Sequence, residues 1–204
     1  MQPRFLVLGA MLLSTAALAQ KPPANPLQGM KPFAGTVVRV DGKEFKLEGP
    51  GGTTATYELA DSARITTSRP GTLADLASGK FVGCTAVSKG SALYATECHI
   101  FPESMRGTGE GHYPMGPPDT TMTNGNVSQM TNGKVVTAKG SASGVMLEVS
   151  YKGGTQEIGV SPVTHITVIG LGDASLLRSG VKVRGAAKTA ADGTESVQML
   201  SISP

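Results

Sequence analysis

Residues 36–48 spell TVVRVDGKEFKLE, and they carry a clear structural signal in this chain of 204 residues. Thr36–Val40 is rich in β-branched side chains, which strands favour. Asp41-Gly42 is a dipeptide typical of tight two-residue hairpin turns. Glu44–Glu48 then alternates polar and apolar residues, the pattern of a strand that is buried on one face. The stretch therefore predicts a β-hairpin with one face in a core.

The residues that follow extend this β signal. Thr54–Leu59 is predicted to be a third strand. Thr72–Ala77 predicts a short helix, because Thr72 can form a capping box with Asp75. Phe81–Val87 and Leu93–Phe101 predict a closing hairpin. Three strands, a short helix and a final hairpin follow the order of a five-stranded OB-like barrel, a mainly all-β fold.

The second half of the chain repeats this order of signals. The matched segments are residues 35–38 with 133–136, 57–59 with 156–158, 73–76 with 173–177, and the hairpin 81–101 with 181–202. Chance similarity between two β-rich stretches is the alternative. The sequence predicts two tandem OB-like barrels, at residues 33–102 and 132–204, each with a short helix.

The chain has two cysteines, Cys84 and Cys98. Folding the hairpin about Ser91 places them directly opposite each other, where facing Cβ atoms lie about 4.5–5.5 Å apart. A disulfide is therefore predicted, and a free reactive or metal-binding pair is the alternative. In the second half the matching positions are Gly185 and Leu200, so the disulfide is not repeated.

The start of the chain has the features of a secretory signal peptide at residues 1–19. Arg4 supplies the positive charge, and the apolar run that follows is shorter than the roughly 20 residues that span a bilayer. Ala17–Ala19 provides small residues before a cleavage site at Gln20, although a short membrane anchor is the alternative. Residues 20–32 predict a flexible Pro-rich tether. We expect a periplasmic or secreted mature chain without a membrane span.

Composition argues against several classes of function. Without Arg4, 17 basic residues face 15 acidic ones, and no Lys/Arg cluster occurs. Aromatic residues make up 4% and Trp is absent, so a nucleic-acid surface of stacked aromatics and basic grooves is not expected. The three histidines lie in no G-x-S-x-G or paired-carboxylate motif. We therefore predict no catalytic residues, no cofactor and no enzymatic activity; an enzyme whose site forms between the two barrels is the alternative.

One long stretch, residues 102–131, lies outside the repeated pattern. It holds His112 and four of the nine methionines, and His99 lies just before it. Thioether and imidazole groups suit copper or zinc. The candidate metal ligands are His99, Met105, His112 and Met115. Because their spacing fits no recognised ligand motif, a packed or flexible Gly/Met-rich linker at residues 103–131 is the alternative.

The same stretch contains the glycine-rich segment Arg106–Gly111. Consecutive backbone N–H groups can form a concave anion site. The segment lacks the Lys of a phosphate-binding loop and has no following helix. Its glycines are therefore better interpreted as turn residues.

The motifs together carry a resemblance. Gly35-Thr-Val with Asp41-Gly42, the alternating strand, and Leu76-Ala-Ser-Gly79 before a hairpin resemble exported bacterial OB-like domains of unknown function. The tandem arrangement with ESMRGTGEGH between the halves resembles a family of uncharacterised periplasmic proteins, over residues 33–204. Some members carry names linked to metal transport, but the family supplies no catalytic residues.

These observations together predict a function at the level of its class. We expect an exported, non-enzymatic binding or assembly module of the bacterial envelope, whose partner is an envelope protein or a small ligand. The alternative is a periplasmic accessory protein that handles copper or zinc through the Met/His stretch.

Overall fold

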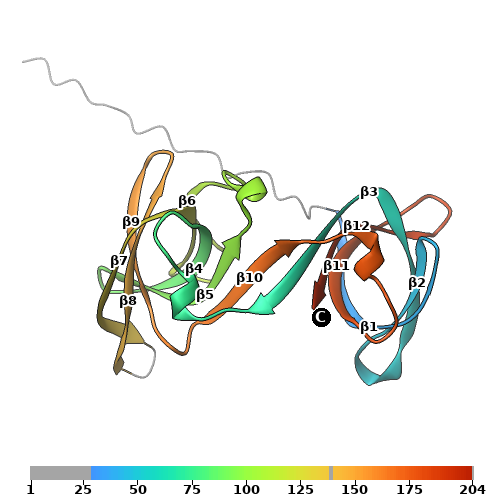
Figure 1. Ribbon diagram of the computed structural model, residues 1–204, viewed down its shortest axis with the longest axis horizontal. Helices are drawn as coiled ribbons and strands as arrows, with labels where there is room; N and C mark the ends of the chain where they lie inside the picture. The colour runs from blue at the N-terminus through green and yellow to red at the C-terminus, as the bar shows by residue number, and fades with distance from the viewer. Residues whose placement is uncertain (1–28, 138–139, 204) are drawn as a thin grey trace, which may run out of the picture.

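The structure is a computed structural model that describes residues 29–137 and 140–203 (Figure 1). The predicted signal peptide and most of the predicted tether lie outside the described residues. Twelve strands are present: β1 (Lys31–Asp41), β2 (Glu44–Glu48), β3 (Thr54–Pro70), β4 (Phe81–Lys89), β5 (Ala92–Phe101), β6 (Gly111–Pro114), β7 (Thr120–Thr137), β8 (Gly140–Tyr151), β9 (Gly154–Val160), β10 (His165–Leu171), β11 (Lys182–Thr189) and β12 (Glu195–Ser203).

Five strands close into a barrel, which we call the terminal barrel because it contains both ends of the described chain. β1 pairs with β2, β2 with β3, β3 with β12, β12 with β11, and β11 with β1. The prediction of a mainly β fold with a closed five-stranded barrel is confirmed. Its buried core combines both halves of the sequence: Val37, Phe45, Leu47, Leu59, Leu177, Val181, Val183, Ala187, Val197, Leu200 and Ile202.

The other strands form a second group, which we call the disulfide unit. β5 pairs with β4, β4 with β7, β7 with β8, and β8 with β9. One further pair, Tyr94 with Gly159, joins β5 to β9 and completes the circuit. The buried core of this unit also draws on both halves: Leu76, Val82, Cys84, Ala86, Ala95, Cys98, Ile100, Val127, Val145, Leu147, Val149, Ile158, Val160 and Ile166.

The closing hairpins have exchanged places. The sequence led us to expect that β4–β5 would close on β1–β3 and that β11–β12 would close on the second half. Instead, β4 pairs with β7, while β11 and β12 pair with β1 and β3. The pairing therefore differs from contiguous barrels at residues 33–102 and 132–204. The physical reason is β3, a continuous strand of 17 residues that runs on to Pro70 instead of turning back.

Two strand ends form a bridge between the two groups, and we call residues 66–70 and 167–171 the junction ribbon. They pair antiparallel, with Ser68 opposite Ile169 at the centre. At one end Gly71 donates its N–H to the Ile166 carbonyl (2.8 Å). At the other end Gly172 donates to the Ile65 carbonyl (3.1 Å). Figure 1 shows β3 and β10 running side by side between the two groups.

Two glycines occupy corresponding places in the two groups. Gly35 pairs with Val183 on β11, and Gly125 pairs with Val82 on β4. In each case a β-bulge follows two residues later, beginning at Val37 or at Val127. Gly125 therefore stands where Gly35 does. The sequence alignment of residues 133–136 with 35–38 was displaced by eight residues, because the β7–β8 hairpin is longer than the β1–β2 hairpin.

The predicted helices are only single 3₁₀ turns: η2 (Leu73–Asp75) and η4 (Ala174–Leu176), with η1 (Pro50–Gly52) and η3 (Glu103–Met105) elsewhere. The capping box at η2 is confirmed, since the Thr72 N–H donates to the Asp75 carboxylate (2.8 Å). A few residues are too few to sustain an α-helix, and Leu76 enters the core directly after η2. Across residues 29–137 and 140–203, no helix has the length and apolar character needed to cross a membrane.

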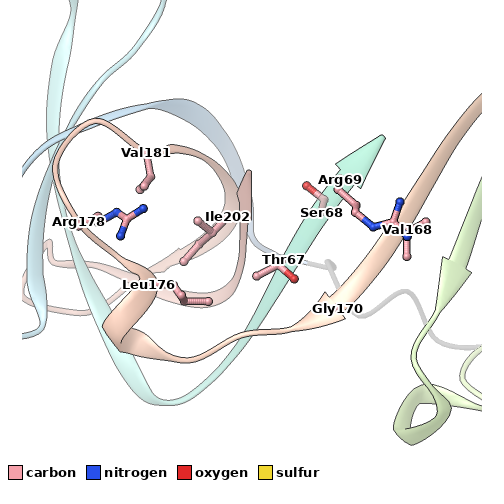
Figure 2. A pocket seen from close by; sticks show the side chains of 9 residues that line it. All are labelled: Thr67, Ser68, Arg69, Val168, Gly170, Leu176, Arg178, Val181 and Ile202. Carbon is pink, nitrogen blue, oxygen red and sulfur yellow. The ribbon is translucent and has the colours of Figure 1, made fainter. Parts of the chain in front are cut away.

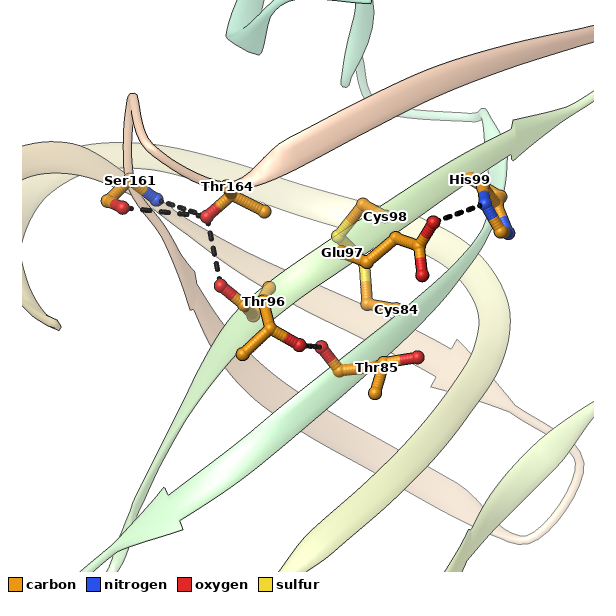
Figure 3. Close-up of a disulfide and its surroundings, with 9 residues drawn as sticks. Cys84, Thr85, Thr96, Glu97, Cys98, His99, Ser161 and Thr164 are labelled. Atoms are coloured by element: carbon orange, nitrogen blue, oxygen red, sulfur yellow. Dashed lines mark hydrogen bonds and ion pairs between the residues drawn. A yellow bond between two sulfur atoms is a disulfide. The ribbon is translucent and has the colours of Figure 1, made fainter. Parts of the chain in front are cut away.

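The predicted disulfide is confirmed. Cys84 and Cys98 are directly paired across β4 and β5, are bonded to each other, and are fully buried (Figure 3). The hairpin register was correct because it depends only on local residues. In β11–β12 the corresponding pair is Gly185 with Leu200, so that hairpin has no covalent link.

Candidate functional site

The stretch expected to be a linker, residues 103–131, contributes strands to the disulfide unit. β6 pairs with β7 from Gly111 opposite Asn124 to Pro114 opposite Thr121. The pairing of β7 with β8 begins only at Asn126. β6 therefore occupies the edge of β7 at the point where β8 has ended.

Arg106 attaches this segment to the rest of the unit. Its Nη2 donates to the Gly79 carbonyl (2.9 Å) and to Glu103 Oε2 (2.6 Å). Its guanidinium lies over the Phe81 ring, 6.0 Å from the centroid. The Arg106 guanidinium, which a bound anion would require, is thus already paired with the Glu103 carboxylate. The hydrogen bond from Arg106 lowers the pKa of Glu103. The segment is a structural turn, as its glycines indicated.

The histidines of the predicted metal site lie on opposite faces of one sheet. Cys98, Cys84, Thr123 and His112 form one row across β5, β4, β7 and β6. Paired residues share a face and successive residues alternate, so His99 points to the other side. There His99 Nε2 lies 3.0 Å from Glu97 Oε1 (Figure 3). The structure therefore does not bring His99 and His112 to one metal ion.

The two methionines lie in different segments. Met105 lies in η3, and Met115 follows β6 with its sulfur 4.0 Å from the Thr85 hydroxyl. In the part of the chain that the structure describes, no three His, Cys, Asp or Glu side chains gather into a group that could hold a metal ion.

His112 instead has a packing environment. Its Nδ1 lies 2.8 Å from the Thr123 hydroxyl, and its ring stacks on Tyr151 with centroids 6.2 Å apart. Burial lowers the pKa of His112 from its ordinary value of 6.5. The His112 ring is therefore neutral in the folded protein at neutral pH.

This environment predicts a pH dependence of the β6 attachment. A histidine with a lowered folded pKa gives its full stabilisation above the unfolded pKa, and that stabilisation is lost as the pH falls through about 6.5 towards the folded value. We expect the amides of β6 to exchange faster at about pH 5 than intrinsic rates explain. NMR titration and hydrogen exchange measure both quantities. His112→Phe should remove the dependence, and a His112 pKa at or above 6.5 would contradict it.

A cavity of about 260 Å³ lies where the junction ribbon meets the terminal barrel (Figure 2). The residues that line it are Thr67, Ser68, Arg69, Val168, Gly170, Leu176, Arg178, Val181 and Ile202. Val181 and Ile202 belong to the buried barrel core, and Leu176 packs against that core. The exposed residue Arg178 adds a guanidinium to this apolar lining. We call this space the junction cavity.

The loop that carries Leu176 and Arg178 is fixed to β1. Gly180 donates its N–H to the Val37 carbonyl (2.8 Å), and Val37 donates back to Val181 (2.9 Å). The Ser179 hydroxyl donates to the Val38 carbonyl (3.1 Å). Three hydrogen bonds next to Arg178 therefore hold one wall of the cavity in place before any ligand arrives.

The corresponding place beside the disulfide unit is charged instead of apolar. There Gly79 donates to Val127 (2.8 Å), as Gly180 does to Val37. If Gly79 is aligned with Gly180, Asp75 stands at the position of Leu176. Its carboxylate accepts a hydrogen bond from Arg69 (3.1 Å). The two ends of the junction ribbon thus offer different chemistry.

None of the candidate ligand residues predicted from the sequence (His99, Met105, His112 and Met115) lines the junction cavity. Its lining comes from the ribbon, the η4 loop and β12, which are brought together by the hairpin exchange. The only local signal was Leu176-Leu-Arg178, an apolar pair followed by a charge, which is common on any amphipathic turn.

Comparisons with known proteins add no relative. Neither family models, nor curated proteins, nor solved structures give a match to this chain. Its function is therefore inferred from its own geometry.

Proposed function

We propose that the protein is an exported, non-catalytic binding module of the bacterial envelope, and that a small, largely apolar ligand occupies the junction cavity. The observation that carries this proposal is the apolar lining by Leu176, Val181 and Ile202 beside a closed barrel. Ligand pockets usually measure about 300–1,000 Å³. A volume of about 260 Å³ therefore favours a ligand smaller than a typical drug.

Export is supported by two independent features. Residues 1–19 have the organisation of a signal peptide. The Cys84–Cys98 disulfide belongs to the folded core, and disulfides persist mainly in oxidising compartments. We further propose that the chain consists of two OB-like repeats that exchange their closing hairpins, in line with the resemblance to tandem periplasmic proteins. The ligand site is then a product of that exchange.

A cavity-filling substitution tests the ligand site. We expect 1-octanol to bind the mature protein saturably with one site, and Leu176→Trp to weaken that binding by at least about tenfold because the indole takes up the space. NMR titration and isothermal titration calorimetry measure the affinity. Leu176 is only partly buried, so the fold should persist, and thermal unfolding checks this.

A matched control comes from the same segment. Leu171→Trp makes the same change at a side chain that is 64% exposed and does not line the cavity, and it should leave octanol binding unchanged. The ligand site would be refuted if the wild-type protein bound no apolar molecule saturably, or if the affinity survived Leu176→Trp.

A further inference from the structure

We propose that the ligand of the junction cavity is a small amphipathic anion, such as a medium-chain carboxylate, and that Arg178 binds its head group. This inference rests on the proposed function, since it assigns the chemical class of the ligand to the same cavity. It also identifies Arg178 as the residue that determines specificity there.

The charge of Arg178 is available to a ligand. Among the residues that the structure describes, no side chain or carbonyl accepts a hydrogen bond from its guanidinium, and no carboxylate lies within ion-pair distance. Arg69, the other arginine of the lining, is already committed to Asp75 (3.1 Å) and to the Pro70 carbonyl (3.1 Å). Within residues 29–137 and 140–203, Arg178 is therefore the cavity arginine without a partner.

The position of Arg178 suits an amphipathic ligand. Figure 2 shows its guanidinium turned towards Val181 and Ile202. A carboxylate held there would direct its tail along the apolar lining. A guanidinium presents paired N–H donors that match the two oxygens of a carboxylate, so recognition of such a head group is geometric as well as electrostatic.

The opposite wall of the cavity presents a hydroxyl group. Gly170 lies on the ribbon opposite Thr67, and a Cβ atom added to Gly170 would lie 2.4 Å from the Thr67 hydroxyl oxygen. The Thr67 hydroxyl therefore occupies the place that a side chain at Gly170 would take. The Thr67 hydroxyl, which lines the cavity, offers a second polar group for the ligand.

The positive charge of Arg178 decides which head groups are accepted. Arg178 is exposed, so its guanidinium can form a charge-assisted hydrogen bond to an anion at the mouth of the cavity. An anion gains from Arg178, a neutral hydroxyl gains little, and an ammonium group is repelled. The expected order of affinity is octanoate, then 1-octanol, then octylammonium.

Calorimetric titration of the mature protein with these three compounds tests the inference. We expect octanoate to bind about tenfold more tightly than octanol, as a charge-assisted hydrogen bond implies. Arg178→Met should reduce octanoate to the octanol affinity, while Arg178→Lys should keep part of the preference. Arg184→Met removes the same charge from an exposed position of β11 outside the cavity, and it should change nothing.

The possible failures are distinguishable. Equal binding of octanoate and octanol, or a preference that survives Arg178→Met, would overturn the anion inference and leave the proposed function standing. If none of the three compounds bound, both would fall.

A second arm separates a free amphiphile from a lipid head group in a bilayer. We expect vesicles of phosphatidylglycerol to retain no more protein on sedimentation than vesicles of phosphatidylcholine. Arg178-dependent binding to phosphatidylglycerol vesicles without octanoate binding would overturn the assignment to a free amphiphile.

Discussion

Truncation of the chain after Leu171 will leave the disulfide unit folded and will unfold what remains of the terminal barrel, the N-terminal strands. Without β11 and β12 the barrel cannot close, because β1 loses its partner β11 and β3 loses its partner β12. They also lose Val183, Leu200 and Ile202 from their core. The disulfide unit loses none of its paired strands, because β4 to β10 lie before the cut.

Hydrogen exchange read by mass spectrometry shows the outcome for each segment. We expect the amides of β1 and β2 to exchange as in an unfolded chain, while those of β4, β5 and β7 remain protected as in the full-length protein. Contiguous barrels would give the opposite result: residues 33–102 would stay protected, and residues 132–171 would exchange freely.

Replacing Gly125 with Ala will destabilise the disulfide unit by about 3 kcal/mol, near the upper end of the usual cost of overpacking. A Cβ atom at Gly125 would lie 2.3 Å from the Ser150 carbonyl oxygen and 2.9 Å from the Val149 side chain. The carbonyl belongs to the backbone of the paired strand β8, so it cannot rotate away. Gly35→Ala should destabilise the terminal barrel similarly, since its Cβ would lie 2.3 Å from the Glu48 carbonyl oxygen.

Urea unfolding followed by hydrogen exchange locates each effect. Gly35→Ala should lower the protection of β1 and β2 first, and Gly125→Ala that of β7 and β8. The matched control is Gly116→Ala, where a Cβ meets no atom within 4 Å, and its stability should change by less than about 0.5 kcal/mol. A Gly125→Ala protein as stable as this control would contradict the steric argument.

The local parts of the fold followed from the sequence. The hairpins at Asp41-Gly42 and around Ser91 were predicted because turn residues and strand alternation act over a few positions. The same reasoning placed Cys84 opposite Cys98, and the disulfide confirms it. Long-range pairing was harder, because an exchanged hairpin makes the same kinds of contact as an unexchanged one.

What selects the exchange is the segment after β3. No glycine interrupts Thr66–Pro70, and the strand continues through this segment into the junction ribbon. Pro70 could have suggested a break, but it lies at the strand end and tolerates that place. The sequence contained this signal, but the predicted third strand, Thr54–Leu59, ended too early.

Sequence reasoning missed both the strands within residues 103–131 and the junction cavity, for different reasons. The start of β7 lacks apolar alternation because its buried side chains include Thr123 and Asn124, which are polar. Asn124 is satisfied by the Gly109 carbonyl and the Tyr113 hydroxyl, both 2.9 Å away. The cavity was not predictable, because Thr67, Leu176 and Ile202 come from separate segments that only the exchange brings together.

Both ends of the described chain leave from one barrel, and this has a mechanical consequence. β1 and β12 flank the same strand, β11, with Lys31 opposite Ala187 and Ser203 opposite Lys182. Tension applied between the termini therefore loads the terminal barrel directly. The disulfide unit lies on the enclosed part of the chain and bears no load until that barrel opens. In a protein anchored at one end and pulled at the other, the terminal barrel would unfold first, and the disulfide unit would stay folded until it does.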